Sequence, residues 1–322
     1  MPKLEWGCWW DETLGRWHAD GLDPELRNVR WYSAGIPVNP TEGEIGDFLG
    51  LDPFRIIWPR PLKANAPHPR TEGEGLVKHA QEYRELKKFL FPEEPVELRY
   101  LKELAELKQQ GRMALWMWLD GFFWFPRTLL GIEDHLYAFY DQPELLLEMN
   151  RDLLNWYLSF LPAMFDIITP DVLLVAEDLS YNHGPMLSQE KFEEICAPFY
   201  RELVPLLKSR GIHPLMDSDG DVTSVIDWCE KVGIEGIGPL ERMAGVDLVE
   251  IRRCHPDFLL LGGFDKTVMH LGEAEMRREF ERILPVMKSG GYLPMPDHQT
   301  PPACSLQNYR LFRKLFDEYA MN

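Results

Sequence analysis

Three carboxylates follow a short apolar stretch in the segment IHPLMDSDGD, residues 212–221. Asp217, Asp219 and Asp221 stand at alternate positions, after a stretch that is too short for a helix and fits a buried strand. Crowded carboxylates repel one another, so some of them should hold a proton near neutral pH, which suits general acid–base catalysis. The same group would also attract a divalent cation or a cationic substrate.

Acidic side chains also follow the other apolar stretches in the C-terminal two-thirds of the chain. The six segments read WMWLD, LLVAED, PLMDSDGD, GPLE, LLGGFD and YLPMPDH. In a parallel barrel the C-terminal ends of the strands converge on one site. We therefore expect one acidic site, formed by Asp120, Glu177, Asp178, Asp217, Asp219, Glu241, Asp265, Asp297 and His298. Because Asp is also a common helix cap and turn residue, some of these acids could act only as caps.

Strands and helices alternate along most of the chain. The six apolar stretches predict strands at 113–119, 171–176, 212–216, 234–240, 258–262 and 292–295, and residues 54–58 predict an earlier one. Strands that are apolar throughout are typical of a parallel sheet covered by helices. No GxGxxG or Walker sequence follows any of them, which argues against an open doubly wound sheet. We predict an α/β fold, a (β/α)8 TIM barrel, with two strands from the first 75 residues.

The N-terminal part differs from the rest in composition. Residues 1–75 are rich in Pro, Gly and Trp and are expected to form an arm and loops that pack on the barrel. Residues 76–322 are expected to form the main body, within a single structural domain. Most tryptophans of the arm should be packing anchors. Trp10 and Trp17, together with Arg16, are expected to wall a ligand pocket.

Charge and cysteine content exclude several classes of protein. The formal net charge of the 322 residues is −18, so nucleic acid and membrane surfaces are not expected as partners. The five cysteines form no CxxC pair, which favours scattered thiols in a reducing compartment. The sequence has no secretory leader pattern and no long apolar run, and we expect a cytoplasmic protein. Whether it forms a homodimer is left open.

Four segments together resemble the uroporphyrinogen decarboxylase superfamily, which also contains corrinoid-dependent methyltransferases. The segments are DVLLVAEDLSYNHGPMLSQEKFEEICAPFYREL, HPLMDSDGDVTSVIDWCEKVGIEGIGPLE, LLLGGFDK and GGYLPMPDHQTPPACSLQNYRLFRKL. They follow one another in the order of that superfamily, and the match as a whole covers roughly residues 100–320. The N-terminal DETLGRW is similar to a divergent branch. The resemblance implies a (β/α)8 barrel with its site at the C-terminal face.

This chain departs from the metal site that the resemblance implies for the methyltransferase branch. That branch binds zinc through a His-x-Cys pair and a further Cys. Here Asp217-Ser218-Asp219 stand where His-x-Cys would, and no Cys lies near Asp297. A divalent metal such as zinc, without thiolate ligands, therefore has Asp217, Asp219, Asp297 and His298 as candidate ligands, and bare acid–base residues are the alternative.

The implied activity is the transfer of a methyl group from a small methylated substrate, such as a methoxyaromatic, to cobalamin on a separate small corrinoid-binding protein. Such a transfer needs a general acid for the departing atom. We expect catalytic roles for Asp217, Asp219, Asp297, His298, Glu177 and Asp178. We expect substrate binding by Trp10, Arg16, Trp17, Asp120, Tyr181, Asn182, His183 and Glu241.

Two other functions remain open at this stage. One is a decarboxylase-like lyase that acts on a carboxylated substrate, and the other is a ligand-binding protein without activity. The decarboxylases carry an RQAGR-type motif whose arginines hold propionates, and nothing similar occurs near residues 6–30. An acidic rim is also a poor receptor for a substrate with eight carboxylates.

Overall fold

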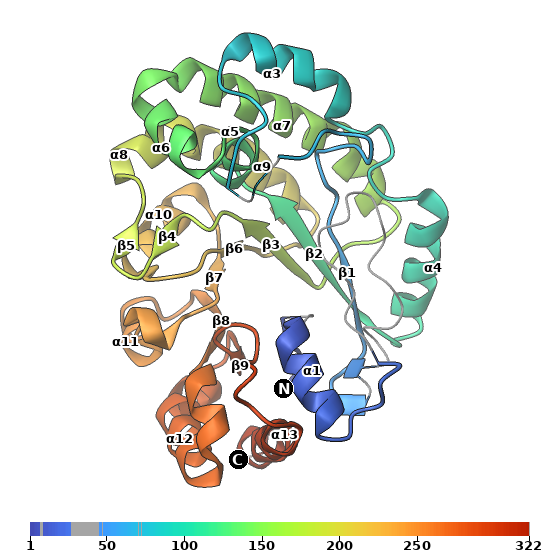
Figure 1. Ribbon diagram of the computed structural model, residues 1–322, viewed down its shortest axis with the longest axis vertical. Coiled ribbons are helices and arrows are strands. Elements are labelled where there is room, and N and C mark those ends of the chain that lie inside the picture. The colour runs from blue at the N-terminus through green and yellow to red at the C-terminus, as the bar shows by residue number, and fades with distance from the viewer. Residues whose placement is uncertain (7–8, 27–44, 47, 70, 72, 322) are drawn as a thin grey trace.

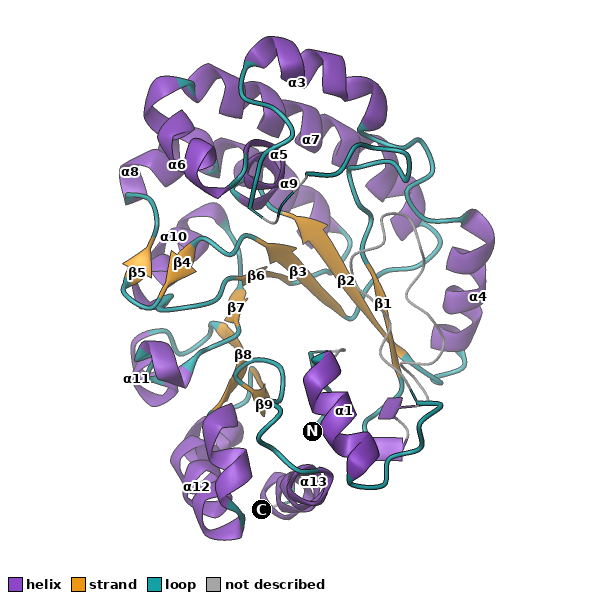
Figure 2. Ribbon diagram, in the orientation of Figure 1, coloured by secondary structure: helices purple, strands orange, loops and turns teal. Residues whose placement is uncertain are grey.

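The computed structural model describes residues 1–6, 9–26, 45–46, 48–69, 71 and 73–321. Its main feature is a curled parallel sheet with helices on its outer side (Figures 1 and 2). The strands lie in the order β1 (Phe54–Ile57), β2 (Ala114–Asp120), β3 (Val172–Ala176), β6 (Pro214–Asp217), β7 (Gly236–Gly238), β8 (Leu259–Phe264) and β9 (Tyr292–Pro296). The predicted fold, an α/β barrel of the TIM type, is confirmed.

Helices follow most of the strands, as the alternation of apolar stretches predicted. They are α1 (Asp11–Ala19), α3 (Ala80–Leu86), α4 (Leu98–Gln109), α5 (Trp124–Leu130), α6 (Ile132–Asp141), α7 (Pro143–Phe165), α8 (Gln189–Ile195), α9 (Ala197–Ser209), α10 (Ile226–Val232), α11 (Leu248–Cys254), α12 (Glu273–Ser289) and α13 (Leu306–Ala320). A short antiparallel hairpin, β4 (Ser180–Tyr181) with β5 (Gly184–Pro185), lies between β3 and α8. The strands are almost entirely buried, because helices cover the sheet.

The register of the sheet places the C-terminal ends of neighbouring strands, where acids were predicted, side by side. Asp120 pairs with Ala176, Ala176 with Asp217, and Asp217 with Gly238. Residues that are more than 110 positions apart in the chain are thereby neighbours in one row. The ends of four consecutive strands therefore face the same rim, as a parallel barrel requires.

The N-terminal segment lies in the opening between β9 and β1. Among the described residues only β1 comes from the first 75, whereas two strands were expected there, and the sheet has seven parallel strands. Trp6 Nε1 donates a hydrogen bond to the carbonyl of Pro296 at the end of β9 (2.8 Å), and Asp52 N donates to the carbonyl of Lys3 (2.9 Å). The arm thus connects the two edges of the sheet with aromatic packing and single hydrogen bonds.

Buried tryptophan holds this arm against the C-terminal end of the chain. Helix α1 lies beside β9 and α13 (Figure 1), and Trp17 Nε1 donates to the carbonyl of Cys304 (2.9 Å). The ring of Trp17 is fully buried and lies 4.8 Å from the ring of Tyr309, centroid to centroid. The arm and the barrel therefore share one continuous apolar core. Within the described ranges, the longest helices are too polar or too short to cross a membrane.

Candidate active site

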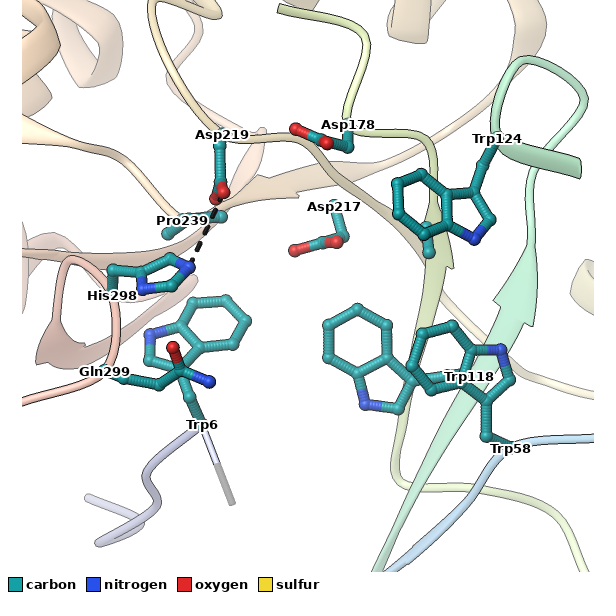
Figure 3. A pocket seen from close by; sticks show the side chains of 11 residues that line it. Trp6, Trp58, Trp118, Trp124, Asp178, Asp217, Asp219, Pro239, His298 and Gln299 are labelled. Carbon is teal, nitrogen blue, oxygen red and sulfur yellow. Dashed lines mark ion pairs between the residues drawn. The ribbon is translucent and has the colours of Figure 1, made fainter. Parts of the chain in front are cut away.

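A cavity of about 230 Å³ opens at the C-terminal ends of the strands (Figure 3). Carboxylates and tryptophan rings lie on opposite sides of it. Its lining consists of Trp6, Trp58, Trp118, Trp124, Ala176, Asp178, Asp217, Asp219, Pro239, His298 and Gln299. A cavity of this size at this end of a barrel is the expected place for a small-molecule site.

The acidic side of the cavity consists of Asp178, Asp217 and Asp219, which we call the cavity carboxylates. Asp217 is the last residue of β6, and Asp178 follows β3 in a left-handed backbone conformation with φ of 43°. Asp178 forms an ion pair with Arg127 (2.9 Å), and Asp219 forms one with Nε2 of His298 (3.5 Å). Within the described part of the chain, no donor or cation contacts the Asp217 carboxylate, which lies above the rings of Trp6 and Trp118 in Figure 3.

These environments change the acidity of the cavity carboxylates. Burial raises the pKa of Asp217 well above its usual value, and the nearby charges of Asp219 and Asp178 raise it further. Burial raises the pKa of Asp178 to about 6, although Arg127 opposes the rise. Burial lowers the pKa of His298, but the interaction with Asp219 outweighs it, so the pKa of this imidazole lies above its usual value. The site can therefore hold protons near neutral pH.

The aromatic side of the cavity was largely missed in the sequence. The ring of Trp118 lies 6.4 Å from that of Trp6 and 5.3 Å from that of Trp58, and the second pair is stacked. Trp124, the first residue of α5, completes the wall. A usable signal was present, because Trp58 and Trp118 stand at the C-terminal ends of two predicted strands, where side chains face the site.

A second set of acids at the strand ends faces away from the cavity and binds backbone amides of loops. Glu177 accepts hydrogen bonds from the N–H groups of Phe122 (2.9 Å), Phe123 (2.7 Å) and Trp124 (2.9 Å), and from the hydroxyl of Tyr200. A side chain at Gly121 would collide with this carboxylate, since an added Cβ would lie 2.1 Å from its Cδ. Burial raises the pKa of Glu177 to about 7, and the hydrogen bonds oppose the rise.

Asp297, Glu241 and Asp120 have similar supporting positions. Asp297 accepts from the N–H groups of Arg242 (2.8 Å) and Lys266 (3.1 Å), and Glu241 accepts from the N–H of Gly220 (2.9 Å) and from Lys266 Nζ (2.9 Å). Asp120 accepts from Trp58 Nε1 (2.8 Å). None of the three lines the cavity. We call Glu177, Asp297 and Glu241 the loop-holding carboxylates, because each binds the backbone of a neighbouring loop.

The predicted substrate-binding residues outside the sheet do not come to the cavity. Trp17 is fully buried under Cys304 and Tyr309, and exposed Arg16 pairs with Asp20. Tyr181, Asn182 and His183 lie exposed on the β4–β5 hairpin. Trp10 is 44% exposed and contacts the cavity lining through Gln299, to whose Oε1 its Nε1 donates (2.6 Å). These residues therefore lie outside the described cavity lining, and their role in substrate binding stays a prediction.

The geometry does not fit a metal ion in the cavity. No three of its described Asp and His side chains bring their ligand atoms within 4.8 Å of one another. In the ranges that the structure covers, such a group occurs only on the surface, at Asp227, Glu230 and His255. The described residues that line the cavity include no cysteine. We therefore derive no step through zinc, and the predicted ligands Asp297 and His298 have other partners, as described above.

The architecture and the position of the cavity define the chain as a (β/α)-barrel protein with its site at the carboxyl ends of the strands. The uroporphyrinogen decarboxylase (URO-D) family profile matches residues 76–319, and the chain belongs to this family. This confirms the family that the four sequence segments indicated. No sequence among the curated proteins matches the chain.

Solved structures share the fold at low sequence identity. A methyltransferase from Methanosarcina mazei superimposes with a TM-score of 0.60 at 12% identity, over 87% of this chain and 84% of that one. A B12-independent methionine synthase from Shewanella sp. W3-18-1 gives a TM-score of 0.37 at 12% identity, over 69% and 65% of the two chains. The 3-keto-D-glucoside 4-epimerase YcjR from E. coli gives 0.38 at 12% identity, over 77% and 100%. Only the first value is high enough to compare folds.

Proposed function

We propose that the chain is a methyltransferase that takes a methyl group from a small methylated substrate and passes it to a corrinoid carried by a separate small protein. The observation that carries this proposal is the cavity itself, in which carboxylates face tryptophan rings and no Lys or Arg is part of the described lining. The fold is shared with a methyltransferase from Methanosarcina mazei, so it can support methyl transfer. Methoxylated aromatics and methylated amines are the substrate classes to test.

The cationic residues near the cavity argue against a decarboxylase acting on a polycarboxylate. Arg127 is paired with Asp178 (2.9 Å), and Lys266 is paired with Glu241 (2.9 Å) and Asp297 (3.4 Å). Arg60 stacks on Trp58, 4.2 Å from its ring centroid, and lies 3.5 Å from Asp120. A substrate with many carboxylates would meet the cavity carboxylates, and the nearby cations that the structure describes already have partners. A cavity of about 230 Å³ also suits a molecule smaller than a macrocycle.

The residues of the cavity can perform the parts of the reaction that a protein must supply. Trp6 and Trp118 provide apolar surface that holds the substrate and excludes water. When the methyl group leaves an oxygen, that oxygen needs a proton, and the raised pKa of Asp217 keeps one available there. Asp219 holds the His298 imidazole at the mouth of the same site. A reduced corrinoid on the partner protein would supply the nucleophile that accepts the methyl group.

The test is an assay with the purified protein, cob(I)alamin and a panel of methoxyaromatics and methylated amines. We expect one class to lose a methyl group only when both the corrinoid and the protein are present, as followed by the corrinoid spectrum and by mass spectrometry of the substrate. The variant Asp221→Asn should keep this activity, because Asp221 lies on the same turn as Asp219 but outside the cavity lining. Release of CO2 from a porphyrinogen, without methyl transfer from any member of the panel, would show that the proposal is wrong.

A further inference from the structure

We propose that the substrate group held in this cavity is a methylated ammonium cation, carried by a small molecule of the size of choline, and not a neutral methyl ether. The inference deepens the proposed function and rests on it for the methyl-transfer step. It stands on one arrangement, the position of an unpaired carboxylate opposite tryptophan rings (Figure 3).

The charges around Asp217 favour a cationic ligand. Arg127 neutralises Asp178 and His298 pairs with Asp219, whereas within the described residues Asp217 has no such partner. Lys266, the next nearby base, is held by Glu241 and Asp297. A buried carboxylate without a partner is costly, and burial with the charges of Asp219 and Asp178 raises its pKa. With a neutral methoxyaromatic in the cavity Asp217 would keep its proton, whereas a positive ligand would stabilise the ionised carboxylate and displace that proton.

The cation must be organic rather than metallic. The described carboxylates and imidazole of the cavity are too widely spaced for three of them to reach one metal ion, since their ligand atoms do not lie within 4.8 Å of one another. A methylated ammonium ion is larger and spreads its positive charge over methyl groups. Such ions bind against the faces of aromatic rings, and Trp is the ring that binds them best. Trp6 and Trp118, with ring centroids 6.4 Å apart, lie opposite the carboxylates.

When the methyl group leaves a quaternary nitrogen, the leaving group needs no proton. The carbon–nitrogen bond breaks, its electron pair stays on nitrogen, and a neutral tertiary amine departs. The methyl group passes to the two-electron-reduced corrinoid of the partner protein, which supplies the electron pair of the new bond. The permanent positive charge of the quaternary nitrogen is lost in this step, and the departing tertiary amine can afterwards take up a proton as an ordinary base.

The first experiment compares a cation with its neutral isostere on the unmodified protein. Isothermal titration calorimetry at low ionic strength, without the corrinoid, measures choline, tetramethylammonium and 3,3-dimethylbutan-1-ol, in which carbon replaces the nitrogen of choline. We expect choline to bind at least about tenfold more tightly than the alcohol. Equal affinities for the two, or no binding of either cation at about 10 mM, would overturn the inference.

The second experiment asks whether Asp217 is the binding group. In Asp217→Asn the affinity for choline should fall at least about tenfold, while the affinity for the alcohol changes less than about twofold. Asp221→Asn removes the same charge from the neighbouring turn and should change neither affinity. Choline should also displace protons from the cavity in the unmodified protein, seen as a heat that depends on the buffer at pH 7, and the alcohol should not. An unchanged choline affinity in Asp217→Asn would contradict the assignment.

The inference and the proposed function fail separately. Demethylation of a methoxyaromatic by a protein that does not bind choline would refute the ammonium site and leave methyl transfer standing. Tight and Asp217-dependent binding of choline, without methyl transfer from any substrate in the panel, would refute the methyltransferase and leave the ammonium site standing.

Discussion

Glu177 and Asp178 are neighbours in the chain, yet they belong to two regions with opposite physical roles. Glu177 is fully buried and binds three backbone N–H groups of the loop after β2, together with the hydroxyl of Tyr200. Asp178 turns into the cavity in a left-handed conformation and joins Asp217 and Asp219 there. The loop-holding carboxylates accept hydrogen bonds from backbone N–H groups of the protein. Of the cavity carboxylates, Asp178 and Asp219 each have one charged partner, and Asp217 has no donor among the described residues. An acid at a strand end is therefore not by itself a catalytic acid.

The same division separates Asp297 from its neighbour His298. Asp297 binds the N–H groups of Arg242 and Lys266, whereas His298 faces the cavity and pairs with Asp219. Side chains alternate between the two faces of an extended strand end, so one residue fixes the loops and the next lines the site. The difference can be tested, because substitutions of the loop-holding carboxylates should lower the free energy of unfolding, whereas substitutions of the cavity carboxylates should weaken ligand binding.

The largest effect is expected for Glu177→Gln. The amide would place an NH2 group opposite backbone donors that now bind a carboxylate, so we expect a loss of about 2–5 kcal/mol in the free energy of unfolding. Urea unfolding followed by circular dichroism measures it. If the free energy of unfolding falls by less than about 0.5 kcal/mol, Glu177 does not stabilise the loop and the separation into loop-holding and cavity carboxylates is wrong.

Asp217→Asn should behave in the opposite way. The change removes a carboxylate without a described partner, so the free energy of unfolding should be unchanged or rise by about 1 kcal/mol. For an ammonium substrate, which needs no proton from Asp217, KM should rise more than kcat falls. Urea unfolding and steady-state kinetics on the same preparation measure both. Marked destabilisation with normal KM would place Asp217 among the structural acids.

Glu5 offers a buried acid that belongs to neither set. It accepts a hydrogen bond from Tyr309 (2.6 Å), and burial raises its pKa to about 7. Because the folded state holds this proton more tightly than the unfolded state, the contribution of Glu5 to stability is present below pH 4.5 and is lost as the pH rises to about 7. Relative to Glu5→Gln, the unmodified protein should lose about 1–3 kcal/mol between pH 5 and pH 8, as measured by urea unfolding at each pH. A difference that is constant with pH would contradict the raised pKa.

The smallest effect concerns the pair at the cavity mouth. Asp219 opposes the effect of burial on His298, so Asp219→Asn should lower the pKa of that imidazole. A pH titration by NMR of the histidine ring protons measures it, and His255, which pairs with Glu230 on the surface, serves as an internal reference. If the His298 resonance titrates as before, the Asp219 pair does not control its protonation.

The sequence determined the fold to a large degree. Apolar stretches of strand length, separated by amphipathic helices, are sufficient to predict a parallel barrel, because strands buried on both faces need helices around them. The ends of β2, β3, β6 and β9 lie within about two residues of their predicted positions. Since the rim of a parallel barrel is made by those ends, the sequence predicts Asp178, Asp217, Asp219 and His298 at one rim, and all four line the cavity there. Their catalytic roles stay predictions.

Only the tertiary structure decided which strand-end acids face the cavity and which rings face them. Glu177 and Asp178 are adjacent in the chain, but their side chains lie in different environments. The local sequence does not determine which of the two accepts hydrogen bonds from backbone N–H groups and which lines the cavity. Trp6 and Trp118 lie more than 110 residues apart and meet because the arm fills the opening between β9 and β1. Trp17, chosen for the pocket from its neighbours in the chain, is instead packed against Tyr309. Residue types and strand ends are local properties, whereas the environment of each side chain depends on contacts between segments far apart in the sequence.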